Sequence, residues 1–453
     1  MLLHASNSLR LLMQAYALPL ALLVQIGCST QPVESSGSDD RESGDNAVLR
    51  WSAIARELMV DPGPIIDSRA LAILHIAIHD AVNAIEDRYE PYGPGLPASP
   101  DASVDAAVAT ATRDVVLALS PSASDQIELE YETALSEIAD GPAKEAGVTL
   151  GRQSARASLD ARASDRIPVG PWPPTSGPIT EPLYVPTDEP GDYAFTPPFD
   201  QPPLGPIALF PGWGRVAPFG TVLSKHPLHG PDPLASEDYA RDFELLESVG
   251  SLDSRTRTAD QTETAFFWFE ELPMWNDIVR GVLEQERADA WTAARTLALL
   301  HLAMADAAIA TFEAKYRFRF WRPITAIRRA DEDGNPSTLP DEDWLPLLST
   351  SPEVVPPEFF TPPIPDYPSA AATISAAAAE VLIASLGDRH DFEATSPTLP
   401  GVTRRFSSFS EAAHESGMSR VYGGIHFLRA VEDGATHGQA IGRDIRELLG
   451  PSR

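Results

Sequence analysis

The chain has 453 residues and a formal net charge of −31 at neutral pH. This length allows roughly two or three average domains, or one large helical core. So acidic a surface repels nucleic acid and anionic lipid, which excludes nucleic acid as the main partner, and any local group of basic residues stands out against it.

Residues 1–28 predict a signal peptide. An apolar run over residues 11–26 follows Arg10 and is interrupted by polar residues and a proline, whereas a membrane span needs about 20 largely apolar residues. Cys28 follows a glycine as in a bacterial lipoprotein box, although Gln25 fits that box poorly. The alternative is an ordinary secretory signal with a chance cysteine. Cys28 is the only cysteine, so no intrachain disulfide forms. We expect an exported protein, periplasmic or held at the outer membrane by lipid on Cys28.

The next segments predict a disordered tether and then helices. Residues 29–47 are rich in serine, glycine and acidic residues, which favours disorder. Residues 48–166 form an N-terminal helical region. Within it, residues 70–85 are apolar on nearly all sides, as in a buried helix. Amphipathic spacing predicts further helices over residues 106–119, 123–139 and 143–163.

Residues 167–235 are rich in proline and predict an irregular segment that wraps the helices. Helices return over residues 236–450, with a long apolar stretch at 290–316, an alanine-rich one at 369–386 and a last one at 425–449. No region is rich in strand signals. The predicted fold class is mainly α, a helical bundle with a proline-rich irregular insert.

A basic segment begins near the end of the long apolar stretch. Lys315 and Arg322 are seven positions apart, so one helix could present both on a single face. Pro323 disfavours a helical Arg322, and the helix is then expected to end just before it. In either case two cations reach one place. Arginine binds an oxyanion through a bidentate fork and lysine as a point charge; the alternative is a solvated basic face.

Two later segments add polar groups of the same kind. Ser369 precedes the alanine-rich stretch as an N-cap, so its hydroxyl and the amide of Ala370 could bind an anion; the alternative is a plain capped core helix. Arg420 is followed at a short distance by His426. A histidine can ligate a metal or act as a nucleophile, but it can also be a satisfied core residue. The glycines at 423 and 424 would let the backbone approach a ligand closely.

Taken together, the three segments resemble the signature of the superfamily of vanadium haloperoxidases and type 2 phosphatidic-acid phosphatases. The matching pattern is Lys, six residues, Arg-Pro; then Pro-Ser; then Ser-Arg, five residues, His. Neighbouring sequence around Asp306, Trp213 and residues 75–85 also looks like bacterial haloperoxidase-type proteins. The resemblance covers most of residues 48–450.

The resemblance implies a vanadate cofactor, with phosphate as an alternative occupant. In that reading Lys315, Arg322 and Arg420 neutralise the oxyanion, and Ser369 and the amide of Ala370 donate hydrogen bonds to it. His426 becomes the axial vanadium ligand, or the nucleophile in a phosphatase. The implied partners are hydrogen peroxide and a halide or small organic substrate.

This chain departs from the superfamily pattern at two places. The pattern Pro-Ser-Gly-His is here Pro-Ser followed by Ala370 and Ala371, so the acid–base histidine is absent. Loss of such a group typically costs about 10²–10⁴ in rate. Four residues after His426, where the family often has an aspartate, this chain has Ala430. Asp433 lies on nearly the same helix face and is expected as a substitute that orients the histidine ring.

Other histidines could replace the missing one. His414 lies just before Arg420, and His301 lies on the helix that leads to Lys315. Each is equally well explained by a surface or core position. His75 and His79 have a spacing that can bind zinc, but without a convincing third ligand we expect them to be structural.

Three functions fit the sequence. The first is a vanadium haloperoxidase-like enzyme, weakened because position 371 is alanine. The second is a phosphatase with His426 as nucleophile. The third is a non-catalytic oxyanion-binding protein at the cell surface.

Overall fold

The computed structural model describes residues 46–59, 64–165, 184–202, 205–349 and 360–452. These described residues form one compact unit. The predicted signal peptide, Cys28 and nearly all of the predicted tether lie outside the described residues, as do residues 167–183, 203 and 204 of the proline-rich segment.

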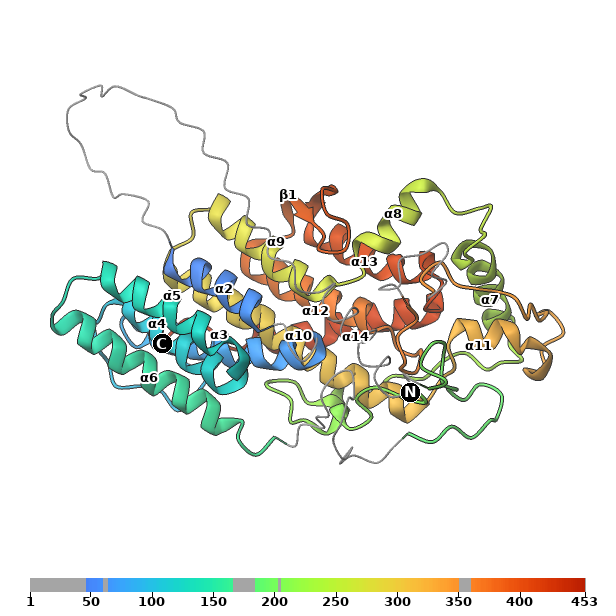
Figure 1. The fold of residues 1–453 in the computed structure, drawn as a ribbon, viewed down its shortest axis with the longest axis horizontal. Coiled ribbons are helices and arrows are strands. Elements are labelled where there is room, and N and C mark those ends of the chain that lie inside the picture. The colour runs from blue at the N-terminus through green and yellow to red at the C-terminus, as the bar shows by residue number, and fades with distance from the viewer. Residues whose placement is uncertain (1–45, 60–63, 166–183, 203–204, 350–359, 453) are drawn as a thin grey trace, which may run out of the picture. The chain divides into compact units, whose positions relative to one another are not determined.

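The described chain is mainly helical, as predicted (Figure 1). Its first group of helices is α2 (Ala47–Leu58), α3 (Pro64–Asn83), α4 (Val104–Leu119), α5 (Ser124–Glu137) and α6 (Pro142–Ala161). A second group is α7 (Glu237–Gly250), α8 (Ala259–Phe267), α9 (Glu271–Gln285), α10 (Ala290–Phe318), α11 (Pro323–Arg328), α12 (Ala370–Leu386), α13 (Phe409–Tyr422) and α14 (Leu428–Arg446). Short 3-10 turns are η1 (Pro121–Ala123), η2 (Trp213–Arg215), η3 (Leu223–Lys225) and η4 (Ala330–Glu332).

Side-chain caps explain where several helices begin. The Asn46 side chain accepts the amide of Val48 at the start of α2, and the Asp289 side chain accepts the amide of Thr292 at the start of α10. Ser369 is the N-cap of α12, as the sequence predicts. Each cap satisfies an amide that has no partner within its own helix.

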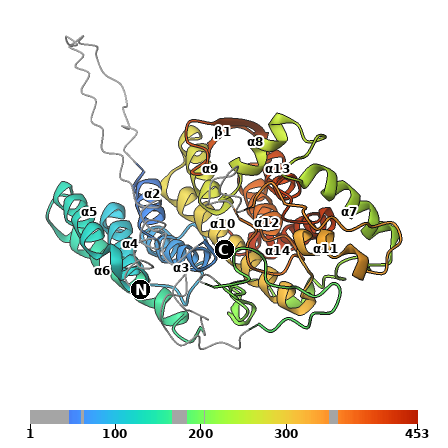
Figure 2. The same cartoon turned by 45° about the vertical axis from the view of Figure 1, so that its right-hand side comes forward.

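Helix α10, which belongs to the second group, joins the two groups of helices. Helices α3, α4 and α6 pack on one another, α5 lies against α4, and α12 packs against α13 and α14. Helix α10 contacts both α3 and α12, and the two views place it between the blue and cyan helices and the orange and red ones (Figures 1 and 2). The second group of helices supplies every predicted anchor of the oxyanion site.

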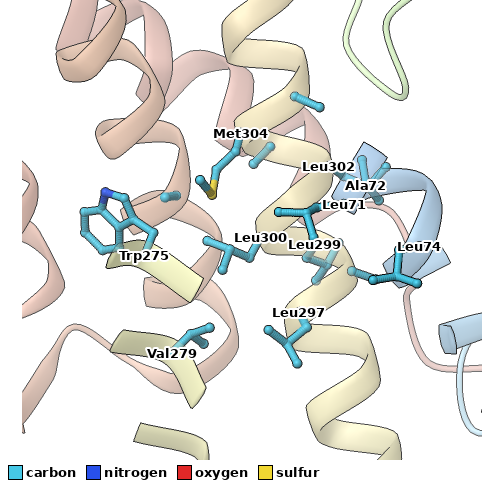
Figure 3. Packing of buried hydrophobic residues seen from close by; sticks show 14 of the residues in the cluster. Leu71, Ala72, Leu74, Trp275, Val279, Leu297, Leu299, Leu300, Leu302 and Met304 are labelled. Carbon is cyan, nitrogen blue, oxygen red and sulfur yellow. The ribbon is translucent and has the colours of Figure 1, made fainter. Parts of the chain in front are cut away.

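The core around α10 is built from leucine, alanine and aromatic side chains. In Figure 3, Leu300 and Met304 of α10 lie toward Trp275 of α9, and Leu299 and Leu302 lie toward α3. Among the described residues, α10 is the one helix long and apolar enough to cross a membrane, and 94% of its most apolar window is buried inside the protein. This burial explains why residues on nearly all sides of the helix are apolar.

The described parts of the proline-rich segment contain only η2 and η3 and lie along α10. Gly214 is so close to this helix that a Cβ atom there would lie 2.5 Å from the Cα of Glu313. The backbone amides of Phe219, Gly220 and Thr221 all donate to the buried carboxylate of Asp306 on α10. These residues of the segment therefore pack on α10, and the proposed division of the chain into regions, including the wrapping segment as a whole, stays a prediction.

One element was not predicted from the sequence. Strands β1 (Arg389–Thr395) and β2 (Thr403–Ser408) form an antiparallel hairpin. The hairpin buries Phe392 and Phe406, and the Phe406 ring contacts that of Trp268. Both strands carry many charged residues on their exposed faces, which masked the alternation of apolar residues.

Candidate oxyanion site

The end of α10 carries Lys315 into the protein interior. The helix stops at Phe318 because Arg319 adopts a left-handed conformation with φ of 54°. Lys315 is fully buried, and its Nζ donates to the carbonyls of Pro365 (2.7 Å) and Asp366 (2.8 Å). Burial, and then the charge of Arg322, lower the pKa of Lys315 well below its ordinary value of 10.5. It is therefore energetically unfavourable to keep the ammonium group charged in this interior, and a neighbouring anion would stabilise the charge.

Arg322 is the N-cap residue of α11 and is also fully buried. Helix α10, which holds Lys315, ends before Arg322, so the turn between α10 and α11 brings the two cations together rather than one helix face. The Nε of Arg322 donates to the carbonyl of Ile364 and its Nη1 donates to the carbonyl of Ile425, both at 2.6 Å. Nη1 also lies 3.2 Å from Nε2 of His426. Nη2 has no acceptor among the described residues.

His426 lies in the turn between α13 and α14 and is 4% exposed. Burial, and then the nearby cations, lower the pKa of its imidazole well below 6.5. The ring is therefore neutral at physiological pH, and its Nε2 accepts from the guanidinium of Arg322. The ring thus carries its proton on Nδ1 and its free electron pair on Nε2, beside the cation.

The glycines before His426 have a different role from the one predicted. Gly424 has a φ of 73°, and a Cβ atom there would lie 2.3 Å from the carbonyl oxygen of Gly250. Glycine is required because this turn packs against the end of α7 and against Pro346. The close backbone approach is to another part of the chain, so the expected approach to a ligand is not what demands glycine here.

Sequence reasoning missed Asp366, which faces His426. Its side chain is fully buried, and its Oδ1 lies 2.9 Å from Nδ1 of the histidine, at an angle that does not make a hydrogen bond. Burial raises the pKa of Asp366 to about 7, against the opposing effects of Arg322 and Lys315. The sequence contained a feature that could have identified Asp366, because it is the one charged residue in the stretch 361–369.

The prediction that Asp433 orients His426 is wrong. The Asp433 carboxylate accepts a hydrogen bond of 2.6 Å from the hydroxyl of Tyr367, and it lies 3.1 Å from Nε of Arg429. Asp433 lies on α14 two turns beyond the histidine, where these partners hold it. Asp366 supplies the carboxylate beside the imidazole instead.

The start of α12 brings Ser369 near the same region. Ser369 is fully buried; its backbone amide donates to the carbonyl of Ala430, and its hydroxyl oxygen accepts the amide of Ala372 at 3.5 Å. Ala370 is partly exposed and Ala371 is 5% exposed. Position 371 therefore faces the interior, but its methyl group can neither donate nor accept a proton.

Arg420 reaches the site from α13. Its Nη2 donates to the carbonyl of Trp268 and to Oε2 of Glu271, each at 2.5 Å, while its Nε has no acceptor among the described residues. The charge of Arg420 acts on both Arg322 and His426. Burial raises the pKa of Glu271, and Arg420 opposes this. The structure thus brings the predicted cations together, and it pairs one of them with a carboxylate.

The two histidines considered as replacements lie elsewhere. His414 is exposed on α13. His301 is fully buried and stacks on His75 with ring centroids 4.4 Å apart. His75 contacts the hydroxyl of Ser52, whereas Nδ1 of His79 contacts Asp80, so these two histidines belong to separate networks.

An oxyanion fits the polar groups that remain without partners. Nη2 of Arg322 and Nε of Arg420 are buried N–H donors that lack an acceptor among the described residues. A buried donor without an acceptor is costly, more so when it is charged. A tetrahedral oxyanion offers acceptors to such donors and carries the charge that they require.

Comparisons with known proteins show what the chain as a whole is similar to. Residues 295–449 match the family model described as VCPO second helical-bundle domain. The sequence is 26% identical to the vanadium chloroperoxidase of Curvularia inaequalis, over 88% of this chain and 81% of that protein.

Solved structures of bacterial proteins share the fold. A vanadium-dependent iodoperoxidase superposes with a TM-score of 0.73 at 23% identity, over 89% of this chain and 96% of that chain. A holo-type vanadium-dependent chloroperoxidase superposes with a TM-score of 0.67 at 18% identity, over 89% and 97% of the two chains.

The chain has the mainly helical fold of these solved structures, and residues 295–449 match a helical-bundle domain model. More particularly, the chain is similar to vanadium-dependent haloperoxidases, and the resemblance predicted from its sequence is confirmed.

Proposed function

We propose that this protein is a vanadium haloperoxidase-like enzyme that uses hydrogen peroxide to oxidise a halide. The residues that would hold the cofactor are Lys315, Arg322, Ser369, Ala370 through its amide, Arg420 and His426. The observation that supports this most directly is the pair of buried arginine N–H groups without acceptors, on Arg322 and Arg420. The relation to vanadium haloperoxidases supports vanadate as the anion.

Each residue has a defined task. When bound, vanadate supplies a Lewis-acidic centre that activates peroxide without changing its own oxidation state. Arg322 and Arg420 contribute permanent positive charge in an interior that excludes water, where charge interactions are strong. His426 is neutral, and its unprotonated Nε2, which here accepts a hydrogen bond from Arg322, is the nitrogen that could ligate a metal.

The alanine at position 371 limits the rate. No imidazole is available there to take or give the peroxide proton. General acid–base groups typically contribute about 10²–10⁴ to a rate. We therefore expect measurable but slow halide oxidation, with oxyanion binding largely retained because every cation is present.

The test is halogenation of a 1,3-diketone dye by the vanadate-loaded protein with hydrogen peroxide, using iodide, bromide and chloride in turn. We expect slow turnover that depends on vanadate and is lost in His426→Ala. His414→Ala is the matched control because His414 is exposed on α13. Absence of vanadate-dependent turnover with all three halides would show that the peroxidase proposal is wrong.

A phosphatase is the second candidate, favoured by the state of His426. A neutral imidazole can attack phosphorus through its unprotonated Nε2, which in this structure accepts a hydrogen bond from Arg322 that an incoming phosphate would replace. Position 371 offers no acid to protonate the leaving group, so a substrate with a good leaving group, such as an aryl phosphate, is suitable. If His426→Ala hydrolyses an aryl phosphate as fast as the native protein, this candidate is excluded.

A non-catalytic oxyanion-binding protein is the third candidate. It is favoured by Ala371 and by the carboxylate of Glu271, which already pairs with Arg420. It predicts binding of phosphate or vanadate with no turnover of either kind. A turnover that disappears in Arg420→Gln would exclude it.

We also propose export, with lipid attached at Cys28. The support is the sequence pattern before Cys28, which lies outside the described residues. In a bacterial host, radiolabelled palmitate should label the native chain and fail to label Cys28→Ser. Equal labelling of the two chains would exclude the anchor.

A further inference from the structure

Asp366 is a buried carboxylate that depends on neighbouring charges rather than on hydrogen bonds. Its side chain is 0% exposed, and neither carboxylate oxygen has a hydrogen-bond partner among the described residues. Oδ1 lies 2.9 Å from Nδ1 of His426 and 4.0 Å from Nη1 of Arg322. The ammonium of Lys315 is bound to the backbone carbonyl of the same residue, at 2.8 Å.

Two other carboxylates in this protein are stabilised differently. The buried Asp306 accepts three backbone amides, from residues 219, 220 and 221. The partly buried Asp242 accepts the amides of Leu428 and Arg429. The backbone amide of Phe427 also acts on Asp366, but it lowers the pKa of that carboxyl less than the charges of Arg322 and Lys315 do, so these two charges do most to compensate its burial.

The Asp366 carboxylate therefore uses the same cations that the oxyanion site requires. A tetrahedral oxyanion held by Lys315, Arg322 and His426 would lie next to this carboxylate and be repelled by it. Two like charges in a low-dielectric interior disfavour each other strongly. Asp366 also lines a small cavity with Tyr239 and Phe427.

We propose that Asp366 is a built-in counter-ion of the oxyanion site, one that competes with phosphate and vanadate for Lys315 and Arg322. The inference rests on the proposed oxyanion site and adds what limits the affinity of that site for its ligand. The site remains stable without an anion, because the carboxylate of Asp366 already lies beside His426 and Arg322.

The experiment is calorimetric titration of the full chain with inorganic phosphate, for the native protein, Asp366→Asn and Asp433→Asn. Asparagine keeps the shape of the side chain and removes its charge. We expect Asp366→Asn to bind phosphate at least about tenfold more tightly. Asp433→Asn is the matched control, because this carboxylate is held by Tyr367 and Arg429, and its affinity should stay at the native value.

Thermal unfolding provides a second readout. Asp366→Asn leaves two buried cations without their carboxylate, so we expect a lower unfolding midpoint without phosphate and a larger upward shift with it than in the native protein. Asp366→Ser, a smaller neutral residue, is measured in parallel so that the result does not depend on one variant folding well.

The outcomes separate the inference from the function on which it rests. If the native protein binds phosphate and Asp366→Asn binds it equally or more weakly, the counter-ion inference is wrong; weaker binding would mean that Asp366 supports His426. If only Asp366→Asn binds phosphate, the inference holds and phosphate is excluded as an occupant of the native site. If no variant binds phosphate, both the oxyanion site and the counter-ion are excluded.

Discussion

Position 371 is the residue where this chain departs most consequentially from the superfamily signature that its sequence resembles. Ala371 is 5% exposed on the first turn of α12. We expect Ala371→His to raise vanadate-dependent halide oxidation by about 10²–10⁴, the usual contribution of a general acid–base group. The larger side chain should cost about 1–3 kcal/mol of stability, because the site is packed.

The control for this variant is Ala371→Asn, which is polar but cannot transfer a proton near neutral pH. Initial rates of dye bromination and the midpoint of urea unfolding are measured for both. Equal rates in the histidine and asparagine variants would mean that the imidazole at this position cannot reach the peroxide proton.

The ion pair between Arg420 and Glu271 is a second feature that depends on individual residues. Their side chains are 6% and 11% exposed and 2.5 Å apart. Removal of one partner of a buried ion pair typically costs about 3–5 kcal/mol, because the other charge is left uncompensated. Arg420→Met should therefore destabilise the protein by about that amount in urea unfolding.

The double variant with Glu271→Gln tests the cause. If the broken ion pair causes the loss of stability in Arg420→Met, the loss in the double variant is smaller than the summed losses of the two single variants, by about 1–3 kcal/mol. Additive losses would instead assign the effect to the hydrogen bond between Arg420 and the carbonyl of Trp268.

At the scale of elements, four helices meet at one buried polar network. His301 of α10 stacks on His75 of α3, and both connect through Asn276 of α9 and Ser52 of α2. Burial lowers the pKa of His301 to about 3. The packing of these helices therefore depends on keeping the imidazole neutral.

This arrangement predicts acid sensitivity. Because the folded pKa of His301 lies below the unfolded value of about 6.5, only the unfolded chain gains this proton as pH falls, and stability is lost between about pH 6.5 and 3. Each such histidine contributes a slope of up to about 1.4 kcal/mol per pH unit. His301→Phe, which keeps the stacking, should reduce the slope of unfolding free energy against pH by up to this amount.

The measurement is urea unfolding at several pH values between about 4 and 6. His414→Phe serves as the control because this histidine is exposed, and it should keep the native slope. A native slope in His301→Phe would mean that His301 does not govern the acid response.

At the scale of the whole molecule, the net charge of −31 opposes the entry of an anion. The Debye length falls from about 30 Å at 0.01 M salt to about 8 Å at 0.15 M. Over this range the association rate of phosphate should increase several-fold, because screening weakens the repulsion.

Stopped-flow tryptophan fluorescence measures this rate, since the carbonyl of Trp268 contacts Arg420. Sodium chloride and sodium acetate should give the same acceleration if screening is the cause. A rate that falls as salt rises would mean that local positive charge at the site outweighs the acidic surface.

Much of the fold could be predicted because its signals are local. Apolar residues spaced for helices, and caps such as Ser369, place helices α4, α5, α6 and α12 within about two residues of their observed limits, whereas α3 begins at Pro64, six residues before the predicted range. The hairpin of β1 and β2 was missed because charged residues dominate its exposed faces. The end of α10 was predicted just before Arg322, but the left-handed Arg319 ends it three residues earlier.

The sequence alone determined the residue types and their order: buried helices, three segments that carry cations, a hydroxyl and a histidine, and an alanine at position 371. Only the tertiary structure decided which charges meet. Glu271 reaches Arg420 across 149 residues of sequence, and Asp366 rather than Asp433 lies beside His426. Helix periodicity is a property of neighbouring residues, whereas the compensation of a buried charge depends on which distant segment packs against it.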